Sequence, residues 1–347
     1  MLLVVLATKF LEGAWIVAIA IPLVILGMHA VHKSYRGVQE RLTVPLTPLP
    51  HSAPHRAVVL LDRLDAPATA ALSCAQAIPG ADVSAVWIGP APVDRALWHR
   101  LAPGIPLSPT PSAQPGLRRA LSDEYSGKAT GITTLVTPLA VALWPLPHVV
   151  SRSNRLQRAA RAAALKSRTR IGVLEPIVHD LRPAADEPLP PSFVDRVCVL
   201  VPSLNAASLR ALDFAARLGT NDVRAVHIAL DPMEAERLEK AWRNEQMDLP
   251  LDLHDSPFRH FGASLTEYLT GLRSGSPQGT IIVMVPEVVP EGVGRTFLYS
   301  HTTTAVRRAL LEQTRVAIAT VPFPIAESSE SLCQPHTSQR HLSRSTG

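Results

Sequence analysis

Glycine and histidine are the residue types whose spacing in this sequence could serve ligand binding. The glycine-rich stretch Gly292-Val293-Gly294 could place backbone N–H groups around a phosphate. It continues as Arg295-Thr296-Phe297, without the spacing of a phosphate-binding loop and without a following Gly-Ser or Gly-Thr pair. The stretch therefore does not by itself predict a nucleotide site.

The thirteen histidines raise the question of a metal site. His29 and His32, like His51 and His55, have helical spacing, but no carboxylate or thiol completes either pair at the spacing of metal ligands. The first pair ends a long apolar run, and the second falls in a proline-rich linker. We expect neither a metal site nor a cofactor.

Two further histidines lie in settings that could suggest chemistry. His227 lies within an apolar, strand-like run, where a core histidine with satisfied hydrogen bonds is the ordinary case. His301 precedes Thr302-Thr303-Thr304, but neither a partner aspartate nor a nucleophile turn is identifiable. We assign no catalytic residue, and we expect that the chain is not an enzyme.

An apolar run of membrane length lies near the start of the chain. Residues 13–32 (GAWIVAIAIPLVILGMHAVH) contain no aspartate, glutamate, lysine or arginine. Twenty helical residues rise about 30 Å, which matches the hydrocarbon core of a bilayer. Trp15 and Tyr35 lie near its ends, and Pro22 and Gly27 are tolerated in spanning helices. We predict a transmembrane helix; a core helix and a cleaved signal peptide are the alternatives.

The charges beside this run predict its orientation. Lys33, Arg36 and Arg41 follow the run, whereas Lys9 alone precedes it, with Glu12 beside it. Loops rich in lysine and arginine stay in the cytoplasm. We therefore predict a cell-membrane protein with a single span and a cytoplasmic C-terminal region, whose first partner is the lipid bilayer.

A second apolar stretch, Met1–Ala7 (MLLVVLA), is too short to cross a membrane. It is typical of the end of a preceding spanning helix, with Thr8–Glu12 as a polar hairpin on the outer face. A frayed N-terminus is the alternative.

Composition limits the remaining classes of function. The chain has 347 residues, 46% of them hydrophobic, enough for two to three domains with cores. Cys74, Cys198 and Cys333 are widely spaced, which predicts neither a disulfide framework nor a zinc site. The basic stretch Arg152–Arg170 has no interleaved aromatic residues, so we expect a solvated or lipid-facing helix and no nucleic acid partner.

Proline-dense stretches mark the domain boundaries. Thr43–Pro54, Pro103–Pro115 and Arg182–Pro191 disfavour a helix or a central strand, and the polar tail Ala326–Gly347 is typical of disorder. The predicted segments are 1–12 (remnant of a preceding membrane helix and outer hairpin), 13–32 (membrane helix), 33–54 (basic juxtamembrane segment and linker), 55–181 (first α/β unit, degenerate), 182–191 (linker), 192–325 (second α/β unit) and 326–347 (disordered tail).

The two predicted units are related by an internal repeat. With an offset of 140, residues 56–92 align without a gap with residues 196–232, and 14 of these 37 positions are identical. Each copy has an apolar run, a helical stretch and a second apolar run, listed here for both copies: Ala57–Leu61, Ala66–Ala77 and Val83–Ile88; Val197–Val201, Ala206–Leu218 and Val223–Ile228. Continuous apolar strands alternating with helices favour a parallel sheet covered on both faces. The predicted fold is therefore α/β, with two repeated, doubly wound units.

Later segments continue this alternation. We predict helices at 155–166, 232–243, 264–272 and 302–312, and strands at 170–174, 249–253, 280–285 and 315–320. Asp231 would cap the helix that begins at Pro232.

Units of this shape resemble the universal stress protein fold, some members of which bind ATP. In that family an aspartate ends the first strand and a glycine-rich loop holds the phosphates. Asp62 ends the first strand of the first copy, but Pro202 stands at that place in the second copy. Together with the incomplete glycine stretch, this departure favours a degenerate scaffold over nucleotide binding.

The N-terminal segment resembles a second family. ATKFLEGAWIVAIAIPLVILGMHAVHKSYRGVQERL is similar to the end of bacterial amino acid–polyamine–organocation permeases that carry a long cytoplasmic C-terminal region. The segments RVCVLVPSLNAASLRALDFA, VRAVHIALDPMEAERLEKAW, DSPFRHFGASLTEYL and VMVPEVVP resemble that region too. The resemblance covers most of 8–45 and 192–325 and is weak over 55–181.

The resemblance implies the C-terminal portion of an amino acid permease-like transporter, with a regulatory or assembly role for its cytoplasmic region. Such permeases have about twelve spans and bind their substrate where early helices are unwound. No such positions occur here, so transport would require permease helices beyond this one. A free-standing, membrane-anchored sensor of the universal stress protein type is the alternative.

Overall fold

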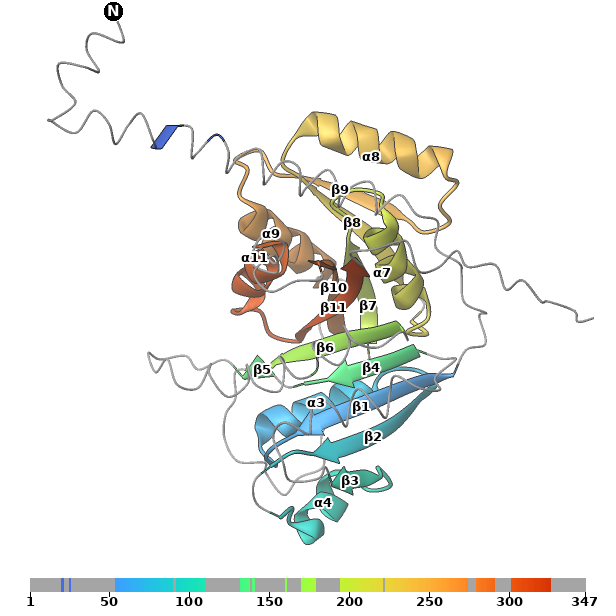
Figure 1. Ribbon diagram of the computed structural model, residues 1–347, viewed down its shortest axis with the longest axis vertical. Coiled ribbons are helices and arrows are strands. Elements are labelled where there is room, and N and C mark those ends of the chain that lie inside the picture. Colours follow the sequence, from blue (N-terminus) through green and yellow to red (C-terminus); the bar gives the residue numbers. More distant parts are fainter. Residues whose placement is uncertain are drawn as a thin grey trace, which may run out of the picture.

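The computed structural model describes residues 20, 21, 25, 54–89, 92–109, 132–137, 139–140, 160, 170–178, 194–220, 222–273, 279–290 and 301–325. These residues form an α/β fold around one eleven-stranded sheet, shown in Figure 1. The α/β fold with a predominantly parallel sheet is the predicted one.

The sheet consists of two halves with the same strand order. The first half contains β1 (His55–Leu61), β2 (Ala81–Trp87), β3 (Leu107–Pro109), β4 (Ile132–Val136), β5 (Leu139–Ala140) and β6 (Arg170–Val178). The second contains β7 (Val194–Leu200), β8 (Val223–Ala229), β9 (Leu251–Asp255), β10 (Thr280–Pro290) and β11 (Val316–Ile325). The full order is β3-β2-β1-β4-β6-β11-β10-β7-β8-β9, with β5 paired to β6 outside this path. Each half is thus parallel with its first strand central, and the two halves meet at β6 and β11.

Strand register is also the same in both halves. Ala57 pairs with Val83 in the first half, and Val197 pairs with Val223 in the second, so the offset of 140 applies to both strands of the pair. The helices that follow the first strands, α3 (Ala66–Gln76) and α7 (Ala206–Ala216), keep this offset at both ends. The two halves are therefore built alike. The universal stress protein assignment of each half stays a prediction.

Side-chain caps explain where these helices begin. Asp65 accepts a hydrogen bond from the N–H of Ala68 at 3.0 Å, and Asn205 accepts one from the N–H of Ser208 at 3.0 Å. Aspartates cap two later helices in the same way: Asp94 caps α4 (Arg95–Leu101), and Asp231 caps α8 (Pro232–Asn244). Such caps satisfy N–H groups that have no partner within the helix.

Helices cover both faces of the sheet. The core on one face runs through both halves and includes α3, α4, α7 and α8. On the other face, α9 (Phe261–Arg273) and α11 (His301–Leu310) pack on the second half. The apolar residues of most central strands are buried on both sides, which is the reason for their continuous apolar sequences.

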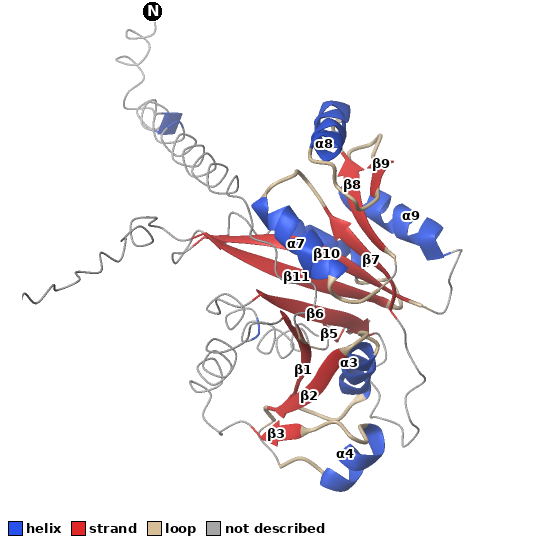
Figure 2. Cartoon of the chain, turned by 90° about the vertical axis from the view of Figure 1, so that its right-hand side faces the viewer, coloured by secondary structure: helices blue, strands red, loops and turns tan. Residues whose placement is uncertain are grey.

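The junction of the halves is an antiparallel pair within a parallel sheet. Residues 173–176 of β6 pair with residues 317–320 of β11. Figure 2 shows the two strands next to each other. The fully buried ring of Phe214 on α7 lies against Gly172 of β6 on one face. On the other face, Arg307 of α11 makes an ion pair with Glu175 of β6. Both contacts join the second half to the last strand of the first.

Several features differ from the sequence prediction. The two predicted units share one sheet, which the sequence did not indicate. The elements α4, β3 and β4 were not predicted, and β3 lies inside the predicted linker Pro103–Pro115. Proline is compatible with β3 because this strand forms an edge of the sheet.

Some predicted segments lie outside the described residues. These are the remnant 1–12, the linker 182–191, the tail 326–347, and nearly all of 33–54 and of the predicted helix 155–166. Of the predicted span 13–32, only Ala20, Ile21 and Ile25 are described, and all three are helical. Within the described part of the chain, no helix has both the length and the apolar character needed to cross a membrane.

Candidate functional site

A cavity of about 330 Å³ lies at the carboxyl ends of β7 and β8. Val201 and Pro202 follow β7, Leu230 follows β8, and α8, α9 and α11 supply the remaining walls through Glu234, Phe261 and Ala305. In doubly wound sheets, ligands bind beyond the carboxyl ends of the strands, and this cavity lies at that edge. The volume falls within the range of small-molecule sites.

The cavity wall is mostly apolar. Of the ten described residues that line it, His227 and Glu234 are polar, and the others are Leu200, Val201, Pro202, Val226, Ile228, Leu230, Phe261 and Ala305. An apolar site with two polar groups favours a ligand with an apolar body and one or two directed hydrogen bonds.

His227 is a buried histidine with only one of its ring nitrogens bonded. It is 5% exposed, and its Nδ1 donates a hydrogen bond to the carbonyl oxygen of Val201 at 2.8 Å. Within the described structure, its Nε2 is buried without a hydrogen-bond partner. Because the carbonyl can only accept, the proton of a neutral ring lies on Nδ1, and Nε2 carries a free lone pair. The prediction of a satisfied core histidine is therefore only half right.

The second polar group of the wall belongs to the first turn of α8. Glu234 is exposed, and Asp231, the cap of the same helix, accepts a hydrogen bond from the N–H of Met233 at 3.0 Å. Carboxylates at a helix N-terminus compensate the positive end of the helix dipole. This end of α8 therefore already carries the negative charge that an anionic ligand would bring.

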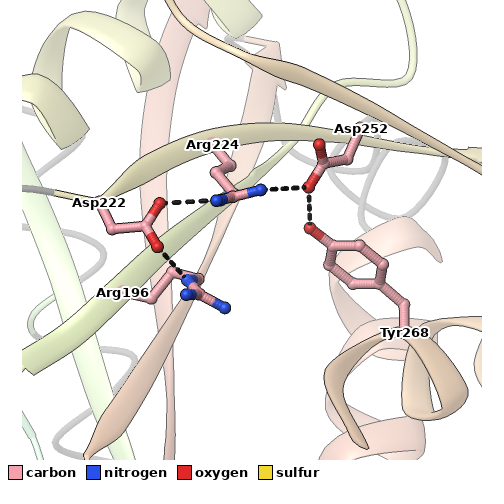
Figure 3. Close-up of polar contacts among 5 residues, drawn as sticks. All are labelled: Arg196, Asp222, Arg224, Asp252 and Tyr268. Carbon is pink, nitrogen blue, oxygen red and sulfur yellow. Dashed lines mark hydrogen bonds and ion pairs between the residues drawn. The ribbon is translucent and has the colours of Figure 1, made fainter. Parts of the chain in front are cut away.

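A chain of charged groups lies on the face covered by α9, toward the amino ends of the strands. Figure 3 shows its order: Arg196, Asp222, Arg224, Asp252 and Tyr268. Asp222 accepts from Arg196 and, at 2.8 Å, from the Nε of Arg224. Asp252 accepts from Arg224 at 3.4 Å and from the hydroxyl of Tyr268 at 2.6 Å.

The charges of this chain balance, and their environment shifts two pKa values. Burial raises the pKa of Asp222, but the hydrogen bonds from Arg224 and Arg196 outweigh it and leave the pKa below its ordinary value. Burial and the hydrogen bond to Asp252 raise the pKa of the Tyr268 hydroxyl. Both groups therefore keep their ordinary charge near neutral pH. The chain of contacts ties β7, β8 and β9 to α9, and we interpret it as structural.

His55, which the sequence places in a linker, is in fact the first residue of β1. It is 9% exposed, and its Nε2 lies 2.9 Å from the hydroxyl oxygen of Thr134 on β4. Burial lowers the pKa of the ring from 6.5 to about 4. His55 is therefore a core residue whose ring is neutral near pH 7.

The burial of His55 predicts a specific loss of stability in acid. Between pH 6.5 and 4 the unfolded chain binds a proton at this ring and the folded chain does not, so the free energy of unfolding falls as the pH falls. This pKa shift should lower the free energy of unfolding by about 3 kcal/mol between pH 6.5 and 4. In urea titrations of the full chain, His55→Gln should flatten the pH dependence by this amount. His99→Gln, at an exposed position on α4, should not, and equal slopes for both variants would contradict the prediction.

The remaining candidates from the sequence do not converge on the cavity. Asp62 directly follows β1 as predicted, but it belongs to the other half of the sheet. His301 begins α11. Gly292-Val293-Gly294 and the histidines at 29, 32 and 51 lie outside the described residues. The two copies differ at two positions of the cavity wall, where Pro202 and His227 stand in place of Asp62 and Trp87, but neither difference by itself indicates a cavity.

The fold is that of a doubly wound α/β protein with a cavity at the carboxyl edge of its sheet. Residues 194–323 match the family profile described as the KimA potassium transporter C-terminal domain. This region is the second half of the sheet, and it contains the whole cavity wall. KimA is a permease of the amino acid–polyamine–organocation type, so the match supports a permease C-terminal portion.

Two other comparisons add little. No curated protein matches the chain. A solved structure of a mutant O-GlcNAc transferase from Thermobaculum terrenum aligns with 14% identity, over 81% of this chain and 61% of that chain, with a TM-score of 0.18. A TM-score this low does not describe a shared fold.

The family match also changes the expected cargo. It indicates a potassium-transporter-related portion and membrane association, and it gives no support to amino acids in particular.

Proposed function

We propose that this chain is the C-terminal portion of a potassium-transporting permease. Its span at residues 13–32 would hold the α/β sheet at the cytoplasmic face of the membrane, beside the helices that conduct the ion. One spanning helix encloses no pathway, so transport would require partner permease helices. The match of residues 194–323 to a potassium transporter domain carries this proposal.

Within such a permease, we propose a regulatory role for the sheet. A cavity at the edge of a domain beside a transporter allows a ligand to change the domain's conformational equilibrium, and through it the transport rate. We propose no enzymatic activity. Potassium uptake in native cells tests the proposal: loss of the gene that encodes this chain should lower uptake when external potassium is scarce.

A free-standing, membrane-anchored sensor is the second candidate. The strand order shared by both halves and the cavity favour it, because both features are complete without a transport core. Purification of the tagged chain from native membranes separates the two candidates. A permease portion should copurify with, or be continuous with, multi-span helices, whereas a sensor should not.

A further inference from the structure

We propose that β9 pairs with β9 of a second copy of this chain, in an antiparallel ladder centred on Leu253. The pairing would join the sheets of two copies edge to edge. This inference concerns a partner of the sheet and does not depend on the transporter assignment.

The strand β9 ends the sheet with one side open. Of the described strands, only β8 pairs with it, and Figure 1 shows it at the end of the sheet. Such a strand presents N–H and C=O groups that can pair with a further strand, and proteins commonly prevent this with proline or a very short strand. At the opposite edge, β3 has three residues including Pro109, whereas β9 has five residues and no proline.

The hydrogen bonds to β8 determine which backbone groups of β9 face the open side. The N–H of Ser256 and the carbonyl oxygen of Pro250 both bond to β8, at 3.0 and 2.9 Å. In a parallel ladder the two backbone groups of one residue point to the same neighbour, and this direction alternates along the strand. The N–H and C=O groups of Leu251, Leu253 and Asp255 therefore face the open side.

Antiparallel pairing about Leu253 uses all of these groups. It places Leu253 opposite Leu253 of the second copy, and Leu251 opposite Asp255. Residues that face each other in this way exchange both of their backbone hydrogen bonds. All five residues of β9 are then paired, whereas a centre at either neighbouring residue pairs fewer.

The side chains favour the same register. Asp252 of each copy would lie opposite His254 of the other, so a carboxylate would face a ring that can donate to it. A centre at residue 252 or 254 would instead place two aspartates or two histidines opposite each other. Leu253 is 39% exposed in one copy, and its counterpart would cover it.

The charge of Asp252 does not oppose this pairing. Charged side chains on an edge strand can discourage association. Here the carboxylate already accepts hydrogen bonds from Arg224 and from the hydroxyl of Tyr268, so it brings no uncompensated charge to the interface.

Disulfide trapping tests the register. The full chain with Leu253→Cys would be oxidised with copper phenanthroline in phosphatidylcholine vesicles, in a Cys333→Ser background because Cys74 and Cys198 are buried. The Cα atoms of a hydrogen-bonded antiparallel pair lie about 5.5 Å apart, within the range that a disulfide spans. Leu253→Cys should therefore give a disulfide-linked dimer. His99→Cys, at an exposed position on α4 in the first half, should not.

A proline tests the backbone pairing. Leu253→Pro removes an N–H that faces the open side, so the hydrogen bonds to β8 are kept. Sedimentation equilibrium of the full chain in detergent micelles should show a dimer for the unmodified chain and a monomer for this variant. Leu253→Thr keeps the N–H and should still form the dimer.

A new charge tests the pairing of side chains. His254→Glu would place a glutamate opposite Asp252 in each copy, and it should raise the dissociation constant about tenfold. Glu267→Gln is the control, because it removes the carboxylate that lies 3.9 Å from His254 within one copy. This variant should leave the dissociation constant unchanged.

The proposal is overturned if the unmodified chain is monomeric, or if the dimer persists in Leu253→Pro. It is also overturned if Leu253→Cys gives no more linked dimer than His99→Cys, or if His254→Glu and Glu267→Gln have equal effects. Trapping through Leu253→Cys tests the register even if Leu253→Pro does not fold.

Discussion

Replacing Arg307 with methionine is expected to lower the free energy of unfolding by about 3–5 kcal/mol. Glu175 on β6 is fully buried, and Arg307 on α11 is the cation that pairs with it. Without Arg307, a carboxylate would remain in the core of the sheet without compensation. The unfolded chain hydrates that carboxylate, so the whole penalty falls on the folded state.

Urea unfolding of the full chain in detergent measures this effect. Arg308→Met is the matched control, because Arg308 is the next residue of α11 and is exposed. The double variant Glu175→Met/Arg307→Met should recover much of the loss, since it removes both charges together. Equal stabilities of Arg307→Met and Arg308→Met would show that the ion pair does not join the halves as described.

Replacing Phe214 with alanine is also expected to lower the free energy of unfolding by about 3–5 kcal/mol. The ring is 1% exposed and lies in the core that runs through both halves. Its removal would leave a cavity between α7 and β6, where the second half rests on the first. The same urea titration measures the loss.

The Phe214 ring can lie against β6 because Gly172 has no side chain. A Cβ built on Gly172 would come within 2.5 Å of the Cζ atom of Phe214, so Gly172→Ala should cost about 1–3 kcal/mol through overpacking. Combining Gly172→Ala with Phe214→Leu should cost less than the sum of the two single variants, because leucine does not reach the new methyl group. Gly271→Ala is the control: a Cβ added to this glycine of α9 would meet no atom within 4 Å outside the adjoining helix backbone, and alanine should stabilise the fold by about 0.5–1 kcal/mol. Additive effects of Gly172→Ala and Phe214→Leu would contradict the contact.

Local sequence predicted much of the second half of the sheet. Apolar runs such as Val197–Val201 are long enough to identify a buried strand, and the capping residues Asn205 and Asp231 mark where α7 and α8 begin. Each of these patterns involves only a few neighbouring residues, so it can be recognised without knowledge of the fold.

The first half was harder to predict because its elements are short. β3 has three residues within a proline-rich stretch, and α4 has seven. Asp94, which caps α4, is a signal that could have identified this helix. The strand β4 (ITTLV) carries two threonines, which weakened its apolar pattern although all five residues are buried.

The junction and the cavity depend on contacts far apart in sequence. Arg307 and Glu175 are separated by 132 residues, and no local pattern pairs them. Likewise, nothing near His227 indicates that its Nε2 lacks a partner. A sequence reveals which side chains a strand carries, whereas pairing across the sheet decides which of them meet.

Potassium uptake by native cells is the most direct test of the claim that this chain belongs to a potassium-transporting permease. Uptake would be followed with radioactive rubidium as tracer at low external potassium, in cells with the gene intact, with the gene deleted, or with a Phe214→Ala or Gly271→Ala substitution. Deletion and Phe214→Ala should both lower the initial rate of uptake, and Gly271→Ala should leave it unchanged. An unchanged rate in the deletion strain, with the chain present in the membranes of the parent strain, would contradict the assignment to a potassium transporter.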